Sequence, residues 1–474
     1  MKTFKTKTLA AALAGVGALG AIGAAEAVYI NPDGHGQVLI YPYYTVRSKA
    51  LGTAPFQSLL SVVNTTSSAK AVKVRFIEGK NSAEVLDFNL FLSAKDVWVA
   101  GIVPTAAGAG VFTPDTSCTV PTVSASPSSP TPFVNFAYAT DPAGGDLDRT
   151  REGYVEIIEM GVVTGTTALA VTHTSAGKPL NCAYVADSTK ITITSPTGGL
   201  FGGMTLINVL AGEDFTAEAV ALDQFRSTGK YDLPGDIKPD LQDVSPATAV
   251  IINGPTVVSA TAVIQNVDAV SALFMHNGVF NEFVLDTATK STTDWVLTMP
   301  TKRYYYSGTI QLDDGTLVNP VEYLFQRNFV STGACDDVSL AIYDREEQTK
   351  TTPPGFSPPP PTGRPGTVCW EANVLTFNAG DALASKNRLS VGTDYQNGWA
   401  ALSFPVSDSS IYEGQYHTLP MSSGTFVGLP VIGFAVQTFN NGALALTDGK
   451  TLVQSNYGGN FAHKYTRSIS SGPL

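Results

Sequence analysis

The sequence predicts an all-β protein of two tandem antiparallel β-sandwich domains, Ig-like or jelly-roll-like, that follow an export signal. Short segments with alternating apolar and polar residues recur along the chain, and a period of two is typical of strands with one buried face. Clusters of Gly, Pro, Asn, Asp and Ser separate these segments, whereas long amphipathic helical patterns are hard to find. The order of several short motifs is also repeated in the second half of the chain.

The first 27 residues have the pattern of a signal peptide. Lys2, Lys5 and Lys7 precede an uncharged run over residues 9–24. The following Ala25-Glu26-Ala27 fits the small-x-small rule, so we expect cleavage after Ala27. The alternative is a transmembrane anchor, but the run of about 16 residues is shorter than the ~20 that cross a bilayer. No later apolar run reaches that length, so we expect no membrane span after cleavage.

The first domain is predicted to cover residues 28–225 and to consist of strands. At residues 71–78, Val72 and Val74 alternate with Lys73 and Arg75, which indicates a half-buried strand. Residues 213–225 are the best helix candidate in the chain, although the stretch is equally compatible with a strand. The other strands of this domain are predicted at residues 37–47, 85–92, 154–159, 191–194 and 205–210.

A polar stretch punctuated by Pro and Gly, residues 226–246, is predicted to link the two domains. The second domain is predicted at residues 247–474. It contains a proline-rich segment, residues 353–365, which cannot form a ladder and which we expect to be an exposed loop with polyproline II character. A ligand for an aromatic groove is the alternative interpretation of this loop. Strands of the second domain are predicted at residues 257–264, 309–312, 338–346 and 431–439.

The repeated motifs indicate an internal duplication. In the first half, Val85-Leu86-Asp87 precedes Asp96-Val97-Trp98. In the second half, Val284-Leu285-Asp286 precedes Asp294-Trp295. Chance recurrence is the alternative, because a β-rich chain reuses the same residue types. We expect the two tryptophans to anchor cores and the aspartates to hold turns.

The four cysteines are predicted to form two disulfides, because an even number in an exported chain is typical of a disulfide framework. Four cysteines allow three pairings. In a two-domain chain the most economical pairing joins Cys118 to Cys182 and Cys335 to Cys369. Their spacing does not fit a metal site, which requires close Cys or His pairs.

Composition and motifs exclude several function classes. The formal net charge of -11 argues against nucleic-acid binding and against attachment to membranes through a polybasic patch. The sequence has no metalloprotease motif, nucleophile elbow or phosphate-binding loop, so we predict no catalytic residue and no enzymatic activity. A glycan-active hydrolase is the weakest alternative, based on the neighbouring carboxylates of Glu156 and Glu159.

One acidic loop is a candidate calcium site. Asp141, Asp146 and Asp148 place three carboxylates within eight residues, and calcium prefers oxygen ligands from such loops. The loop lacks the EF-hand spacing, and a solvated turn is the simpler interpretation. We predict no other cofactor.

A run of three tyrosines, Tyr304, Tyr305 and Tyr306, is a candidate for glycan contact, because exposed rings stack on sugars. The alternative is a strand in which the rings fill the core, and this is the simpler interpretation.

Several segments together are similar to a family of exported proteobacterial proteins that are described as hypothetical or cell-surface proteins. They are Ile40-Tyr41-Pro42-Tyr43-Tyr44, Asn64, Val74-Arg75-Phe76-Ile77-Glu78-Gly79-Lys80-Asn81-Ser82, Asp294-Trp295 through Pro300-Thr301-Lys302-Arg303, and Asn397-Gly398-Trp399-Ala400. The resemblance covers most of the mature chain. It implies a Gram-negative envelope or extracellular location and supplies no catalytic or binding residue.

These observations predict an exported, non-enzymatic structural or adhesive protein of the cell exterior that associates with itself or with other envelope components. A carbohydrate-binding, lectin-like protein whose partner is a polysaccharide is the alternative. The periplasm is the alternative location. Residues 28–47 are predicted to form an edge strand that pairs between copies, because Pro42 suits a sheet edge.

Overall fold

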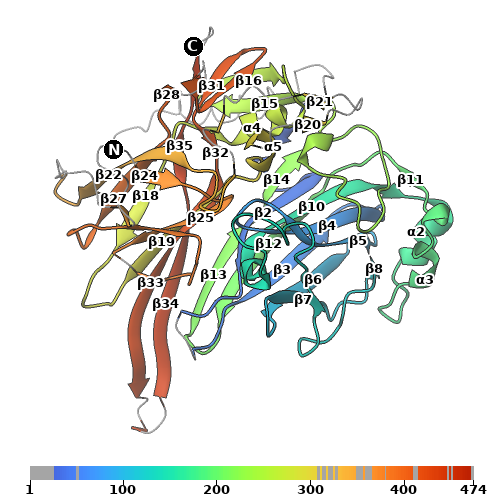
Figure 1. Cartoon of the computed structure of the whole chain (residues 1–474). Coiled ribbons are helices and arrows are strands. Elements are labelled where there is room, and N and C mark those ends of the chain that lie inside the picture. Colours follow the sequence, from blue (N-terminus) through green and yellow to red (C-terminus); the bar gives the residue numbers. More distant parts are fainter. Residues whose placement is uncertain are drawn as a thin grey trace, which may run out of the picture.

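The computed structural model of the chain describes residues 26–49, 53–306, 310–311, 317–318, 324–325, 329–347, 356–357, 366–378, 380–408, 415–445, 448–449 and 452–470. These residues form an all-β fold with four large sheets and only short helices (Figure 1). In the large sheets all strand pairs are antiparallel, apart from one parallel pair. The predicted fold class is therefore confirmed. The signal segment, residues 1–25, lies outside the described residues.

Two sheets come from the first half of the chain. The first runs, in spatial order, β1 (Tyr29–Ile30), β14 (Val220–Asp223), β2 (Val38–Thr45), β10 (Glu152–Val163), β4 (Lys70–Glu78), β5 (Glu84–Leu92) and β8 (Cys118–Val120), and β11 (Ile193–Thr194) pairs with β10. The second runs β13 (Glu213–Glu218), β12 (Leu200–Asn208), β3 (Gln57–Asn64), β6 (Val97–Pro104), β7 (Ala109–Phe112) and β9 (Thr131–Pro132).

Two further sheets come from the second half. The third runs β24 (Gly366–Val368), β22 (Asp336–Asp344), β27 (Asn397–Ser403), β18 (Gly278–Val284) and β35 (Lys464–Thr466). The fourth runs β23 (Phe356–Ser357), β26 (Arg388–Val391), β25 (Ala372–Phe377), β19 (Thr292–Thr298), β33 (Ile432–Ala445) and β34 (Leu452–Ala462), with β25 and β26 parallel.

Small sheets and short helices complete the described chain. The small sheets pair β15 (Thr248–Asn253) with β16 (Thr256–Thr261), β17 (Met275–His276) with β32 (Leu429–Pro430), β20 (Ile310–Gln311) with β21 (Leu317–Val318), β28 (Ser407–Asp408) with β29 (Gln415–Tyr416), and β30 (Thr418–Met421) with β31 (Gly424–Val427) and β36 (Ser468–Ser470). The helices are η1 (Leu147–Arg151), α2 (Gly165–Val171), α3 (Cys182–Val185), η2 (Ser188–Lys190), η3 (Leu241–Asp243), α4 (Val267–Phe274) and α5 (Arg303–Tyr306).

Two large cores hold these layers together, and each takes residues from both halves of the chain. Leu60 and Trp98 fill the space between the first and second sheets, and Val296 and Val436 from the fourth sheet belong to the same core. The other core contains Trp295 and also Ile40 of β2. Packing is therefore continuous across the predicted linker, while the proposed domain limits and the internal duplication stay predictions.

Of residues 28–47, for which the sequence predicts an edge strand, the short strand β1 lies at the edge of the first sheet. Strand β2, which carries Pro42, does not. It pairs with both β14 and β10 inside the first sheet, and all its residues are buried. Its Pro42 lies in a bulge of β2 itself, where the register shifts between Gly153 and Val155 and where Pro42 and Tyr43 lie opposite the single residue Tyr154. The carbonyl of Pro42 accepts a hydrogen bond from the Thr298 hydroxyl at 2.6 Å. This strand therefore has no free edge to offer another copy.

The outer side of β4 is also buried, against the prediction of a half-buried strand. Lys73 is fully buried, and its Nζ donates to the Asp87 carboxylate at 2.6 Å and to the carbonyl of Leu233 at 2.6 Å. The amide of Gly235 in turn donates to Asp87 at 2.8 Å. Residues 226–246 thus lie across this side of the sheet and satisfy its charges. They are a packed segment of the fold, not only a connection.

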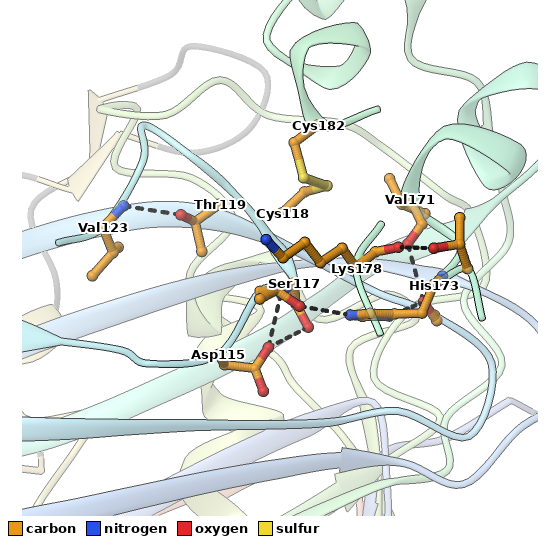
Figure 2. The surroundings of a disulfide bond; sticks show 12 residues. Asp115, Ser117, Cys118, Thr119, Val123, Val171, His173, Lys178 and Cys182 are labelled. Atoms are coloured by element: carbon orange, nitrogen blue, oxygen red, sulfur yellow. Dashed lines mark hydrogen bonds between the residues drawn. A yellow bond between two sulfur atoms is a disulfide. The ribbon is translucent and has the colours of Figure 1, made fainter. Parts of the chain in front are cut away.

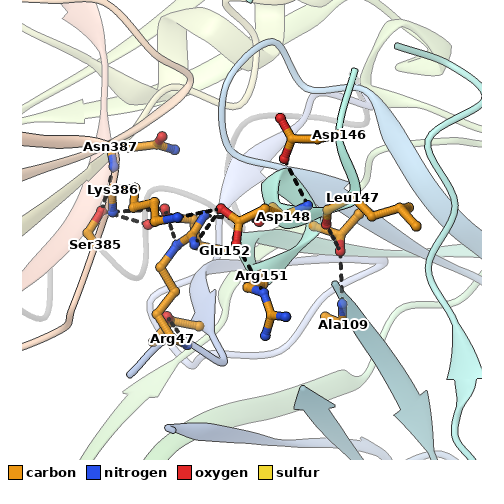
Figure 3. Close-up of polar contacts among 12 residues, drawn as sticks. Arg47, Ala109, Asp146, Leu147, Asp148, Arg151, Glu152, Ser385, Lys386 and Asn387 are labelled. Atoms are coloured by element: carbon orange, nitrogen blue, oxygen red, sulfur yellow. Dashed lines mark hydrogen bonds and ion pairs between the residues drawn. The ribbon is translucent and has the colours of Figure 1, made fainter. Parts of the chain in front are cut away.

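A buried carboxylate joins the two halves (Figure 3). Glu152 at the start of β10 is 1% exposed and accepts four hydrogen bonds. Two come from the first half, from Arg47 Nε at 2.6 Å and the Tyr43 hydroxyl at 2.8 Å. Two come from the second half, from the Ser385 hydroxyl at 2.6 Å and the Lys386 amide at 3.0 Å.

Both predicted disulfides are confirmed. Cys118 is bonded to Cys182, which ties β8 to α3 (Figure 2), and Cys335 is bonded to Cys369 next to β22 and β24. Two disulfides fit an oxidising environment outside the cytoplasm. Within the described part of the chain, no helix is long and apolar enough to cross a membrane.

The local predictions differ from the structure in a few places. Residues 213–225 contain the strands β13 and β14 instead of a helix. The short helix α4, all of whose residues are buried, is not identified from the sequence. Its two polar residues, Asp268 and Ser271, share one face but bond to the Tyr305 hydroxyl in the interior instead of facing solvent. Trp98 and Trp295 are both fully buried, as expected for core anchors. Most of the proline-rich segment at residues 353–365 lies outside the described residues.

Candidate functional site: an apolar sheet face

The outward side of the second sheet carries a group of exposed apolar side chains. We call this group the apolar face; it consists of Leu59, Val63, Val97, Val99 and Phe201. The strand register brings them together, because Phe201 of β12 lies opposite Val63 of β3, which lies opposite Val97 of β6. Four of the five are 40–49% exposed. Rings and branched side chains from three neighbouring strands thus form one surface.

The inward side of the same strands explains why these residues lie outside. Leu60, Val62, Trp98 and Met204 are at most 2% exposed and fill the core between the first two sheets. Successive side chains of a strand point to opposite sides, so the residues between them face solvent. The outward set is mostly apolar as well, with Gln57, Ser61 and Thr205 as its polar side chains, and this is unusual for a sheet with one side in water.

Ionisable groups are absent from this surface within the described strands. The outward positions of β3, β6 and β12 are Gln57, Leu59, Ser61, Val63, Val97, Val99, Gly101, Val103, Phe201, Gly203, Thr205 and Ile207. Charges begin at its borders: Asp214 and Glu218 are exposed on the neighbouring strand β13, and the exposed Lys95 before β6 donates to the carbonyl of Thr65 after β3. An uncharged surface of this kind can be covered without the cost of desolvating charges.

Small residues keep the middle of the surface flat. Gly203 lies opposite Ser61, which lies opposite Val99, and the Ser61 hydroxyl accepts a hydrogen bond from the Gly203 amide at 3.3 Å. At Gly101 a side chain would collide with the ring of Phe112, which lies over this glycine from β7. With these small residues at its centre, the surface suits a broad, flat partner more than a small ligand.

The predicted calcium ligands do not converge on a common point. Asp141 is bound by Arg149 at 3.2 Å and by the Asn81 amide, and Asp146 caps η1 by accepting from the Asp148 amide at 3.0 Å. Asp148 pairs with Arg47, Arg151 and Lys386 (Figure 3). Hydrogen bonds and charges from Lys386 and Arg47 outweigh partial burial and lower the pKa of Asp148 to about 2. Calcium binding stays a prediction.

The first two predicted glycan-contact rings lie in the core. Tyr304 and Tyr305, in the short helix α5, are 7% and 3% exposed. The Tyr305 hydroxyl bonds to Asp268 at 2.9 Å. A buried ring offers no face to a sugar, so these two residues do not form a glycan platform. The side chain of Tyr306 lies outside the described part of the structure.

An exposed aromatic pair occurs elsewhere, on the outward side of the third sheet. Trp399 of β27 is 42% exposed and stacks on Tyr343 of β22, with ring centroids 4.3 Å apart and planes inclined by 10°. The exposed Glu282 lies next to Trp399 on β18. Sequence reasoning missed this pair because its two members are far apart in the chain.

The carboxylates considered for a hydrolase each have their own cation. Glu156 binds Arg75 at 2.5 Å, and Glu159 binds Lys70 at 2.5 Å. Both carboxylates are buried, and burial raises the pKa of each. They stabilise the interior of the first sheet, and neither lines the pocket described below.

No family model matches the chain, and no curated protein is similar to it. The assignment of a function therefore depends on the geometry and chemistry of the described surfaces.

Proposed function

We propose that the chain is an exported, non-enzymatic structural or adhesive protein of the bacterial cell exterior that works by self-association. The apolar face is the observation that carries this proposal. A contiguous uncharged surface on a sheet exterior is rare on a protein that remains a monomer, and it typically marks an interaction surface. The two disulfides support a place outside the cytoplasm.

The partner proposed for the apolar face is the same face of a second copy. Strands lie ~4.8 Å apart and rise ~3.3 Å per residue, so about eight residues of the strands β12, β3 and β6 present roughly 380 Å². Two copies packed face to face would cover about 760 Å² in total, the size of a weak, reversible contact. The three strands themselves carry no outward charge, and the charges at their borders, Asp214 and Glu218 on β13 and Lys95 before β6, would lie at the rim of the contact.

The test is sedimentation of the purified mature chain over a wide concentration range. We expect reversible association of the natural protein. Val99→Lys should weaken it at least tenfold, because a lysine in the middle of the interface must be buried without a partner. The same substitution leaves the monomer folded, because residue 99 faces solvent. Circular dichroism verifies this.

Ile237→Lys is the matched control, since Ile237 is 63% exposed and lies outside the apolar face. It introduces the same charge and should leave association unchanged. A natural protein that stays monomeric at high concentration, with and without calcium, would overturn the proposal. Equal effects of the two lysines would show that the apolar face is not the interface.

Carbohydrate binding is a second candidate, supported by the Trp399–Tyr343 pair. Exposed tryptophan and tyrosine rings offer apolar faces and edges to the C–H groups of a sugar. The expected result is retention of the protein on an insoluble polysaccharide such as cellulose, chitin or peptidoglycan, with retention lost in Trp399→Ala. Retention unchanged by this substitution would exclude the aromatic pair as the binding site.

A further inference from the structure

A pocket lies between strands from the two ends of the described chain. Its volume is ≈ 220 Å³, and its walls come from β1, β15, α4 and the segment around β35. Ile30 and Val250 contribute apolar surface, Tyr29 and Tyr465 contribute rings, and Arg467 contributes the cation that lines it. At about 30 Å³ per water molecule the pocket has room for a small ligand only.

The Arg467 side chain is held in place by three carbonyl groups. Nε donates to the carbonyl of Met275 at 3.0 Å, and the two terminal nitrogens donate to those of Ile252 at 3.0 Å and Leu273 at 2.7 Å. Two of these carbonyls lie at the C-terminal end of α4, where a cation is favourable. A guanidinium has five N–H donors, so two remain for another acceptor. The group is therefore fixed in position and still able to bind.

Among the described residues, the partly buried Arg467 shares with Arg226 and Arg303 the lack of a carboxylate at ion-pair distance, but only Arg467 lines the pocket. Arg47, Arg75 and Arg149 each pair with two carboxylates. In the described part of the structure, no carboxylate lies within ion-pair distance of Arg467, and burial lowers the pKa of its guanidinium. The carbonyls at the end of α4 explain the orientation of the Arg467 side chain, but they provide no full negative charge. A partly buried cation is stabilised by a full negative charge nearby.

We propose that this pocket binds a small monocarboxylate with an apolar body. The carboxylate would accept the two remaining N–H groups of Arg467, and the apolar body would lie against Ile30, Val250 and the Tyr465 ring. That ring is itself fixed by stacking on His276, with centroids 4.0 Å apart. The site thus combines one positioned cation with a preformed apolar wall, as small-molecule sites typically do.

Neighbouring charges favour a single negative charge on the ligand. Asp223 accepts a hydrogen bond from the Tyr29 hydroxyl at 3.3 Å, and Asp33 also lies close enough to act on this tyrosine. Their negative field opposes a second negative charge at the Tyr29 side of the pocket. Inorganic phosphate and dicarboxylates should therefore bind more weakly than monocarboxylates of similar size.

The experiment measures thermal stabilisation and calorimetric binding of the mature chain with acetate, butyrate, hexanoate and benzoate. The corresponding amides are the matched uncharged probes. We expect a saturable rise in melting temperature with the carboxylates and at least tenfold tighter binding of hexanoate than of acetate, because each buried CH₂ adds affinity. The amides should give no such rise. Equal effects of carboxylates and amides would overturn the proposal.

Two variants and a control assign binding to the pocket. Arg467→Met should weaken hexanoate binding at least tenfold. Because this variant also loses contacts to α4, Ile252→Trp is the second test. The Ile252 side chain is 44% exposed and only its carbonyl contacts Arg467, so the variant narrows the pocket and keeps those contacts. Lys464→Met, which removes an exposed cation three residues from Arg467, should bind normally. A folded Ile252→Trp protein that binds hexanoate with unchanged affinity would refute the site. If Arg467→Met lowers the melting temperature without ligand but leaves hexanoate binding unchanged, the role of Arg467 is purely structural and the proposal fails.

Discussion

Glu152→Gln tests whether the carboxylate that joins the two halves stabilises the whole chain. The substitution keeps the shape of the side chain and removes its charge. The glutamine NH₂ can turn towards the hydroxyls of Tyr43 and Ser385, which can accept as well as donate. The glutamine oxygen then accepts the hydrogen bonds from Arg47 Nε and from the Lys386 backbone amide. The main loss is therefore the ion pair with Arg47, whose side chain is 6% exposed.

Glu152→Gln is expected to lower the free energy of unfolding by about 3 kcal/mol. Removing one partner of a buried ion pair typically costs 3–5 kcal/mol, and about the lower value applies here because Arg47 keeps Asp148 at 2.9 Å. Urea unfolding followed by tryptophan fluorescence measures the change, since Trp98 and Trp295 report on different cores. The assay detects whether both halves unfold in a single transition.

Lys386→Ala is the control for this prediction. Its ammonium group also reaches the network, at 2.8 Å from Asp148, but the two side chains are 65% and 37% exposed. Exposed pairs contribute about 1 kcal/mol or less, so the control should change stability little. If Glu152→Gln costs no more than Lys386→Ala, the argument that this buried carboxylate holds the halves together is wrong.

Three further predictions concern pH and the disulfides. Burial raises the pKa of Asp294 from 3.8 to about 6. The protonated carboxyl therefore contributes fully to the free energy of unfolding below pH 3.8, and this contribution is lost as the pH rises through 6. Urea titrations measure the free energy of unfolding of Asp294→Asn minus that of the natural protein. This difference should rise by about 3 kcal/mol, in favour of the variant, between pH 4 and pH 7. A difference that does not depend on pH would contradict the prediction. Burial lowers the pKa of His463 from 6.5 to about 4. The neutral imidazole therefore contributes fully to the free energy of unfolding above pH 6.5, and this contribution falls as the pH is lowered towards 4. The glutamine of His463→Gln can still donate to the carbonyl of Val296. Between pH 7 and pH 5, the free energy of unfolding of this variant should fall by about 2 kcal/mol less than that of the natural protein. An unchanged pH profile would refute the role of this histidine. Replacing Cys335 and Cys369 by serine opens a link across a sequence separation of 34 and should lower the free energy of unfolding by about 4 kcal/mol. Calorimetry of the variant against the oxidised natural protein measures this loss, and equal stability of the two would contradict it.

The sequence was informative where local chemistry decides the structure. The alternation of Val72 and Val74 with Lys73 predicted strand β4, and cysteine spacing in an exported chain predicted both disulfides. Burial of Lys73 was not predictable, because the carbonyl that completes its shell belongs to Leu233, far away in the sequence. The interior place of Pro42 depends similarly on the pairing of its strand with the distant strand β10, against which β2 forms a bulge.

The aromatic candidates show the same limit. Tyr304 and Tyr305 looked suitable for sugar contact because three rings are adjacent, yet the short helix α5 directs both rings into the core. Trp399 and Tyr343 come together only through pairing of β27 with β22. A pattern within one segment indicates its local conformation, whereas its exposure is determined by what packs on it.

The apolar face follows from the same reasoning. Strands β2 and β6 both have apolar residues at consecutive positions, and in a single sequence such runs indicate burial on both sides. For β2 this is correct, because Ile40 packs into one core and Tyr41 into the other. For β6 it is correct except at one end of the outward side: Trp98 is fully buried and the outward Val103 is 5% exposed, while Val97 and Val99 remain 49% and 40% exposed. The sequence of β6 is therefore that of a strand covered on both sides, and a second copy of the chain on the apolar face would supply the missing layer.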